Sequence, residues 1–241
     1  MRPTIYLFGD SITEQSFLQA AWGASLANLY CRRADVVLRG YGGYNTRWAL
    51  RVLNKGKVFP PPQSSGGAPL AVTVFFGAND AALPDSFNAG VHVPLEEYKQ
   101  NLRSIVAIFK ERWPTTSVIF ITPPPIDEAA RLLDPDNKLG VVERTNKVAG
   151  QYAKACVAVA ADCGIPSIDL WSKMQQSPGW QKAFLSDGLH LTPAGNTIVF
   201  EEVVRKFEEA GLKPEMLPLD LPLCNDLVPP NDALEVLDKF S

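Results

Sequence analysis

The sequence predicts an α/β protein: a three-layer α/β/α sandwich in which helices cover both faces of a five-stranded parallel sheet. One observation behind this prediction is that five short apolar segments alternate with segments whose apolar residues recur at helical spacing. Another is that residues 70–76 are apolar at nearly every position, which is typical of a central parallel strand buried on both faces.

The predicted strands are short apolar segments that cover residues 5–8, 36–38, 70–76, 118–121 and 165–170. The first ends at Gly9, where the chain can turn sharply, and the second runs into a loop rich in glycine. Three consecutive prolines that begin at Pro123 stop the fourth strand. Because helices alternate with these strands, we expect a parallel sheet with flavodoxin-like strand order.

The predicted helices cover residues 22–32, 94–109, 148–163 and 192–207, and a further helix begins near residue 48. Pro94 suits a first helical turn, because the N–H that proline lacks has no partner there in any case. Thr192 is a typical N-cap residue, and proline follows it at the first helical position.

The composition indicates one globular domain. A length of 241 residues, 46% hydrophobic residues and a net charge of -3 give no reason to expect a nucleic-acid partner. The start of the sequence has no signal-peptide pattern, and no apolar segment is long enough to insert into a membrane. The four cysteines have no close cysteine or histidine companions, so we expect free thiols, no metal site and a cytoplasmic location.

The end of the chain differs from the rest. We assign residues 1–208 to the α/β core and residues 209–241 to a proline-rich extension that packs on this core. A short helix is expected in the extension near residues 233–240. A partner-binding tail is the alternative interpretation, and the sequence leaves the oligomeric state open.

Candidate catalytic residues follow the predicted strands. Ser11 comes directly after the turn that ends the first strand, and the carboxyl ends of parallel strands are where such folds bind ligands. Only two histidines are present, and His190 lies three positions after Asp187. This spacing allows the Asp187 carboxylate to hold Nδ1–H of His190 and leave Nε2 for the Ser11 hydroxyl. A solvated loop histidine beside a capping acid is the plainer alternative.

Candidate donors for an oxyanion lie on the neighbouring loops. Gly43 follows the second strand and Asn79 follows the third, and these strands are expected on either side of the first. The N–H groups of Ser11 and Gly43 and the amide of Asn79 would then point at one site. When each residue is considered alone, Gly43 can also be explained as a turn glycine and Asn79 as an Asx-turn residue.

Four segments of the sequence resemble the motif blocks of the GDSL or SGNH hydrolases. They are Gly9-Asp10-Ser11, the glycine-rich loop around Gly43, Gly77-Ala78-Asn79-Asp80, and Asp187-Gly188-Leu189-His190. The resemblance implies the SGNH hydrolase fold, with Ser11 as nucleophile, His190 as base and Asp187 as its orienting acid. It also implies that Ser11, Gly43 and Asn79 form the oxyanion hole and that no cofactor is needed.

Within that family the amino-acid sequence is most similar to the isoamyl acetate-hydrolysing esterases, chiefly over residues 39–49, 92–98 and 121–125. This similarity implies a serine esterase of ester or lipid metabolism that acts on small acetyl or short-chain acyl esters. A thioesterase, lysophospholipase or sugar O-deacetylase would use the same residues, and a non-catalytic binding protein on the same fold is the remaining alternative.

Three further residues are candidates for the substrate pocket: Phe76, His92 and Pro124. Phe76 lies close to the Asn79 loop, Pro124 follows the fourth strand, and His92 is the second histidine, which we expect at the pocket rim.

Overall fold

The computed structural model describes residues 2–56, 58–60, 67–133, 137 and 140–227. Five parallel strands form one sheet, in the order β2-β1-β3-β4-β5. The strands are β1 (Thr4–Gly9), β2 (Asp35–Gly40), β3 (Ala71–Phe75), β4 (Ser117–Ile121) and β5 (Ser167–Ile168). The predicted flavodoxin-like order and parallel sheet are confirmed.

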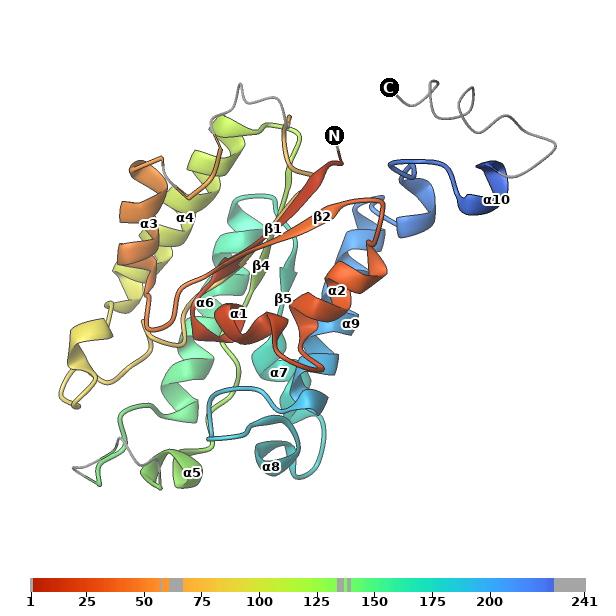
Figure 1. The fold of residues 1–241 in the computed structure, drawn as a ribbon. Helices are drawn as coiled ribbons and strands as arrows, with labels where there is room; N and C mark the ends of the chain where they lie inside the picture. The colour runs from red at the N-terminus through yellow and green to blue at the C-terminus, as the bar shows by residue number, and fades with distance from the viewer. Residues whose placement is uncertain (1, 57, 61–66, 134–136, 138–139, 228–241) are drawn as a thin grey trace.

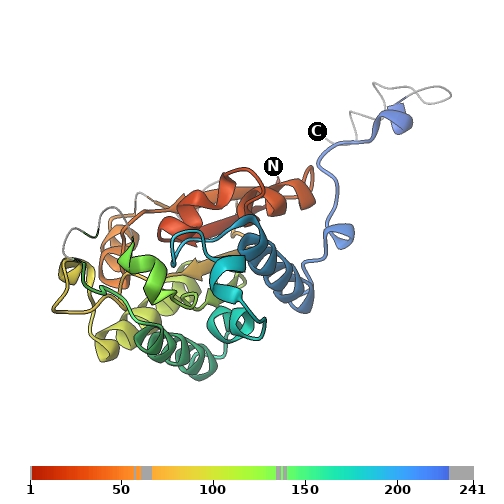
Figure 2. The ribbon, with the colours of Figure 1, turned by 90° about the horizontal axis from the view of Figure 1, so that it is seen from below.

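Helices cover both faces of this sheet (Figures 1 and 2). The helices that pack against one face are α3 (Thr46–Asn54), α4 (Leu95–Arg112) and α6 (Asn146–Asp162). Those on the other face are α2 (Trp22–Leu29), α7 (Leu170–Gln175) and α9 (Pro193–Glu209). The remaining short elements are α1 (Ser11–Glu14), η1 (Gln15–Phe17), η2 (Ala89–Val91), α5 (Glu128–Leu132), α8 (Trp180–Phe184), η3 (Pro214–Met216) and α10 (Cys224–Leu227).

The alternation of side chains along β1 builds the two halves of the core. Tyr6 and Phe8 point to the face that carries α3 and α4, while Ile5 and Leu7 point to the face that carries α2 and α9. All four are at most 5% exposed, so the strand is buried on both faces, as a strand inside a parallel sheet must be.

Aromatic rings fill the first half of the core. The rings of Phe8 and Phe76 meet edge to face, with centroids 4.8 Å apart, and the rings of Phe59 and Phe109 do so at 5.3 Å. Each such contact adds about 0.5–1.5 kcal/mol beyond the burial of apolar area. This packing fixes the strands, and with them the loops that follow each strand.

Glycine is required where β1 ends. A Cβ on Gly9 would lie 2.0 Å from Oγ1 of Thr13 and 2.6 Å from the carbonyl oxygen of Phe75. The backbone of Gly9 therefore passes between α1 and β3 with no room for a side chain. Asp10 then caps α1, accepting the N–H of Ile12 at 3.0 Å, which makes Ser11 the first residue of that helix.

The segment after α9 follows the end of α2 and then leaves the body. The Tyr30 hydroxyl donates to the carbonyl of Leu212, and Arg32 donates to Asp220 and to the carbonyls of Leu221 and Pro222. Beyond these bonds, α10 stands away from the sheet and its helices (Figure 2). We keep the boundary at residue 208 as a proposal, and the helix predicted near residues 233–240 lies outside the described residues.

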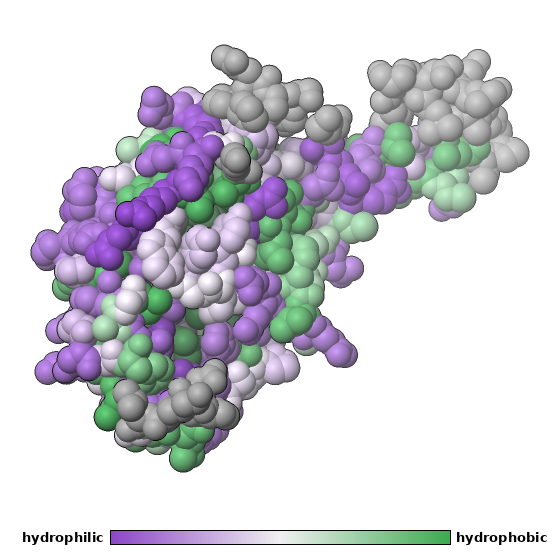
Figure 3. All heavy atoms as spheres, turned by 60° about the vertical axis from the view of Figure 1, so that its left-hand side comes forward, coloured by the Kyte–Doolittle hydropathy of each residue, from purple (hydrophilic) through white to green (hydrophobic). Residues whose placement is uncertain are grey.

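The surface mixes polar and apolar side chains. Figure 3 shows the two kinds interspersed on one face, with apolar side chains gathered at its lower edge, near α5. Within the described ranges, no helix is both long and apolar enough to cross a bilayer.

Candidate active site

Three of the residues singled out in the sequence form one hydrogen-bonded chain. Oγ of Ser11 lies 2.8 Å from Nε2 of His190, although 179 positions separate the two residues. Nδ1 of His190 lies 2.7 Å from Oδ2 of Asp187. With its proton on Nδ1, the imidazole donates to Asp187 and accepts the Ser11 O–H at Nε2. This is the arrangement that activates a serine hydroxyl as a nucleophile.

The local fold of residues 187–190 holds the imidazole in place. Oδ1 of Asp187 accepts the backbone N–H of Leu189 at 2.9 Å and that of His190 at 2.7 Å. Gly188 allows this tight turn because its φ is +88°, and a Cβ there would lie 2.6 Å from the carbonyl oxygen of Asp127. The same carboxylate therefore shapes the loop with one oxygen and orients the ring with the other.

These contacts keep Asp187 ionised. Burial alone raises the pKa of its carboxyl, but the hydrogen bond from His190, the electrostatic attraction of that ring and the two backbone N–H groups outweigh burial. The net result is a pKa well below the ordinary value. Asp187 is therefore an anion wherever the protein is folded at neutral pH, which suits it to stabilise an imidazolium.

Burial has the opposite effect on the neighbour of Ser11. Asp10 is fully buried, and burial raises its pKa to about 7 despite the N–H that it accepts from Ile12. Its second oxygen, Oδ2, has no hydrogen-bond partner among the described residues. The sequence singled out Asp10 only as part of a motif, and the structure places it as the cap of α1.

The loops after β1, β2 and β3 are tied together beside Ser11. The N–H of Tyr41 donates to the carbonyl of Gly9 at 2.8 Å, and the N–H of Asp10 donates to the carbonyl of Phe75 at 3.2 Å. The carboxylate of Glu14 accepts the N–H of Gly42 at 2.7 Å. These bonds bring the glycine-rich loop to the edge of the sheet at which Ser11 lies.

Asn79 joins this arrangement through its side chain. Its Nδ2 donates to the carbonyl of Tyr44 at 2.9 Å, and Oδ1 accepts from Nη2 of Arg144 at 3.0 Å. One N–H of the amide is used by Tyr44, and the amide carries a second N–H. Gly43, next to Tyr44, has a φ of +76°, and no atom lies within 4 Å of the place where a Cβ would be.

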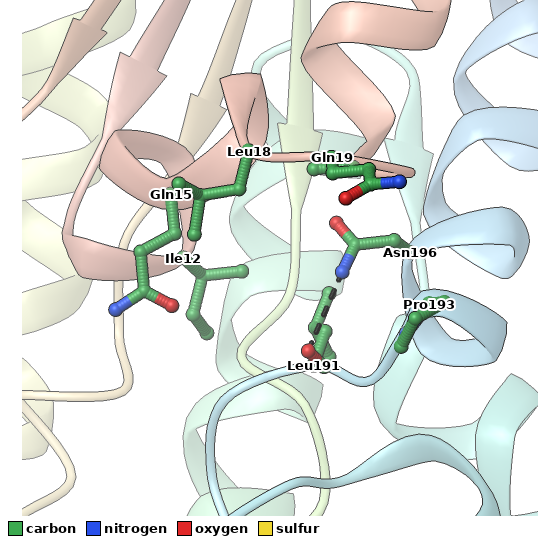
Figure 4. Close-up of a pocket in the computed structure, with 8 residues that line it drawn as sticks. Ile12, Gln15, Leu18, Gln19, Leu191, Pro193 and Asn196 are labelled. Atoms are coloured by element: carbon green, nitrogen blue, oxygen red, sulfur yellow. Dashed lines mark hydrogen bonds between the residues drawn. The ribbon is translucent and has the colours of Figure 1, made fainter.

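A small pocket lies between residues of α1, η1 and the start of α9 (Figure 4). It has a volume of about 90 Å³ and is lined by Ile12, Gln15, Leu18, Gln19, Ala21, Leu191, Pro193 and Asn196. Ile12 directly follows Ser11, and Leu191 directly follows His190. The amide of Asn196 supports the wall, because its Nδ2 donates to the carbonyl of Leu191 at 3.4 Å.

The structure places the three residues predicted for the substrate pocket as follows. Phe76 is 1% exposed and packs against Phe8 in the core, so its ring is turned away from the site. Nδ1 of His92 lies 2.6 Å from the carbonyl oxygen of Ala82, in the loop after β3. Pro124 is buried where β4 ends, and none of the three lines the pocket in Figure 4.

Sequence reasoning missed the pocket and a charged cluster next to the site. Arg131, Glu143 and Arg144 are buried, and they contact both Asp187 and Asn79. No short motif marks them, since charged residues between predicted elements are usually solvated. Among the described residues, no group of three or more His, Cys, Asp or Glu side chains could hold a metal ion.

Comparison with known proteins identifies relatives over the whole core. The model of the family described as GDSL-like Lipase/Acylhydrolase matches residues 5–203. A GDSL esterase/lipase of Arabidopsis thaliana is 60% identical over 243 aligned residues, which is 100% of both chains. The human isoamyl acetate-hydrolyzing esterase 1 homolog is 45% identical over 98% of this chain and 92% of its own.

A solved structure agrees with these sequence matches. The lipase/acylhydrolase from Enterococcus faecalis superposes with a TM-score of 0.66 and 27% identity, over 87% of this chain and 96% of the other. The similarity thus extends from the sequence motifs to the fold.

Proposed function

The chain belongs to the GDSL-like lipase/acylhydrolase family and is a carboxylic ester hydrolase, and from this premise we propose that it is a serine esterase for small, short-chain carboxylic esters. The observation that carries the proposal is the hydrogen-bonded chain from Ser11 through His190 to Asp187, at 2.8 and 2.7 Å. This chain supplies a nucleophile, a base and an ionised acid in the order that ester hydrolysis requires.

The proposed reaction has two halves. The Ser11 hydroxyl attacks the ester carbonyl while Nε2 of His190 takes its proton, and a tetrahedral intermediate forms. His190 then gives the proton to the departing alcohol oxygen as the C–O bond breaks, which leaves an acyl group on Ser11. Water, deprotonated by His190, attacks this acyl-enzyme. His190 returns that proton to Oγ of Ser11 as the acyl C–O bond breaks, which releases the carboxylic acid and restores the Ser11 hydroxyl.

The proposed oxyanion hole consists of the N–H groups of Ser11 and Gly43 and the free amide N–H of Asn79. The hydrogen bond from Asn79 to the carbonyl of Tyr44, at 2.9 Å, supports this assignment because it holds the glycine-rich loop beside the amide. Donors fixed in advance stabilise the charge that develops on the carbonyl oxygen without having to reorganise.

The size of the pocket in Figure 4 supports a substrate whose alcohol part is short. His190 must deliver its proton to the leaving oxygen, so the alcohol part of the ester belongs on the side of Leu191, away from Asn79. A volume of about 90 Å³ is smaller than the roughly 150 Å³ of a cavity that holds benzene. We therefore assign this pocket to a short alkyl group of the alcohol.

The human relative's name describes isoamyl acetate hydrolysis, and we propose a substrate of that kind, an acetate ester of a short alcohol, for this chain. The four free cysteines support a reducing compartment, so we propose the cytoplasm as its location.

A panel of substrates on the purified protein tests the proposal. Alkyl acetates with alcohols of increasing length are compared with acyl-CoA, lysophospholipid and acetylated sugar substrates, with the folded Ser11→Ala variant as control. We expect the highest kcat/KM for a short alkyl acetate and none above background for Ser11→Ala. A preference for acyl-CoA, lysophospholipid or acetylated sugar would instead assign the same residues to a thioesterase, a lysophospholipase or a deacetylase.

A further inference from the structure

A buried cluster of three charged side chains lies between the two halves of the proposed site. Arg131 on α5 is 6% exposed, Glu143 is 0% exposed, and Arg144 is 4% exposed. One carboxylate oxygen of Glu143, Oε1, accepts from Nε of Arg131 at 2.7 Å and from Nη1 of Arg144 at 2.9 Å. The two guanidinium groups thus share one carboxylate oxygen, and we call these three residues the Arg–Glu–Arg bridge.

Each end of the bridge contacts a different part of the proposed site. Nη1 of Arg131 lies 3.3 Å from Oδ2 of Asp187, the same oxygen that His190 contacts. At the other end, Nη2 of Arg144 donates to Oδ1 of Asn79 at 3.0 Å, and Nε of Arg144 donates to the carbonyl of Ala78 at 2.9 Å.

The chemistry of a guanidinium group decides how the Asn79 amide is oriented. The oxygen and nitrogen of a carboxamide have nearly the same shape, so packing alone does not select between its two flipped forms. Arginine has only donors, so the oxygen of Asn79 must face Arg144. The NH₂ group is then turned to the opposite side, where it donates to the carbonyl of Tyr44 and, in the proposed function, to a substrate oxygen.

The bridge and Asp187 together place two arginines and two carboxylates in contact. Burying charged groups costs several kcal/mol for each ion, and well-packed apolar side chains often give a more stable protein. Stability alone therefore does not explain the bridge, whereas a need for fixed geometry at Asp187 and Asn79 does.

We propose that Arg131, Glu143 and Arg144 are positioning residues that lock the acid of the proposed triad and the amide of the proposed oxyanion hole into one rigid unit. This inference rests on the proposed function. Arg144 acts through Asn79, whose NH₂ group it turns toward the oxyanion. Arg131 acts through Asp187, which it holds in line with His190. Glu143 fixes the distance between the two guanidinium groups.

The test compares Arg144→Met with Asn79→Ala and with the double variant. We expect Arg144→Met to lower kcat at least about tenfold, a part of the roughly 10²–10³-fold that one oxyanion donor supplies, with KM within about twofold of wild type. Because the proposal assigns the effect of Arg144 on kcat to Asn79, adding Arg144→Met to Asn79→Ala should lower kcat by less than about twofold more. Losses that multiply in the double variant would overturn the proposal.

The same design tests the other end of the bridge. Arg131→Met alone should lower kcat, but in the Asp187→Asn background it should add little. Arg103→Met is the control variant, because Arg103 pairs with Asp162 on the surface and is 41% exposed. It should keep wild-type kcat and KM.

Further variants separate positioning from folding. Arg144→Lys keeps a donor for Asn79 and should recover part of the kcat that Arg144→Met loses. The concentration of active sites in each variant is measured by titration with a fluorophosphonate, and kcat is calculated per active site. Wild-type kcat per titrated site in Arg144→Met, or in Glu143→Gln if Arg144→Met does not fold, would overturn the bridge. If Ser11→Ala is inactive while these variants are fully active, only the bridge fails; if Ser11→Ala stays active, the proposed function fails.

Discussion

Nε2 of His190 lies 2.8 Å from Oγ of Ser11, and this short distance joins the loop after β1 to the turn before α9. The two residues are brought together by the parallel sheet, which places the loops after its strands at one edge. Asp187 completes the chain at 2.7 Å. The chemistry proposed for the protein depends on this alignment, and the predictions below follow from it.

Replacing the acid should disable the base without unfolding the protein. In Asp187→Asn the amide can donate a hydrogen bond, so His190 is no longer held with its proton on Nδ1. We expect kcat for a short ester to fall on the order of 10⁴-fold, measured by steady-state kinetics. Asp35→Asn is the matched control, because Asp35 forms an exposed ion pair with Arg2 at the start of β2. Equal activity of the two variants would contradict the assignment of Asp187.

Gly43 and Gly211 offer a matched pair of glycine variants. Their φ angles are +76° and +78°, and at each position a Cβ would meet no atom within 4 Å. Alanine at either position should cost about 1–2 kcal/mol of stability, because the left-handed conformation strains an L side chain. Only Gly43→Ala should also lower kcat, by about tenfold or more, since its methyl group enters the space in front of the proposed oxyanion donor. Comparable loss of kcat in both variants would argue against that role.

The pocket in Figure 4 should set the preferred alcohol. Leu18 lines it and is 61% exposed, so Leu18→Ala widens the pocket at little cost to the fold. We expect kcat/KM to shift toward longer alkyl acetates, by up to about tenfold for each added methylene that now fits. Leu221 is another exposed leucine, and it lines a different pocket, with Arg2 and Arg33, so Leu221→Ala should leave the profile unchanged. A shift in acyl-chain preference instead would assign the pocket to the acyl group.

Two buried carboxyls should make stability depend on pH. Burial raises the pKa of both Asp10 and Asp80 to about 7, from an ordinary 3.8. Between these values the folded protein holds more protons than the unfolded chain, so the free energy of unfolding falls as the pH rises from about 4 to about 7. Above about pH 7 the free energy of unfolding levels off. Asp187, whose pKa is lowered, acts in the opposite direction and only below about pH 4.

Urea unfolding at several pH values tests this expectation. The fall in stability between about pH 4 and pH 7 should be on the order of a few kcal/mol for each carboxyl. Asp10→Asn and Asp80→Asn should each reduce it, because an amide stays neutral throughout. An unchanged slope in both variants would show that neither carboxyl takes up a proton on folding.

The sequence was sufficient to predict those features of the fold and the site that depend on a local pattern of residues. The apolar strands and the glycines that follow them place Ser11, Gly43 and Asn79 at one edge of the sheet. The spacing of Asp187 and His190 gives their contact, because residues three apart in a turn share a face. The alternation of strands and helices also predicts that the sheet is parallel.

Features built from contacts distant in sequence were not predictable. The helices α5, α7 and α8 have five or six residues each, too few to show helical periodicity. Phe76 was expected beside the substrate because it precedes the Asn79 loop, yet its ring packs on Phe8. The Arg–Glu–Arg bridge was missed because burial alone distinguishes it from an ordinary charged loop.

The most direct test of the central claim is peptide mass analysis after reaction with a fluorophosphonate ester. We predict one adduct, on the peptide that carries Ser11, with loss of ester hydrolysis in proportion to labelling, and no adduct in the folded Ser11→Ala variant. An inhibited protein with Ser11 unmodified, or undiminished hydrolysis by Ser11→Ala, would contradict the account.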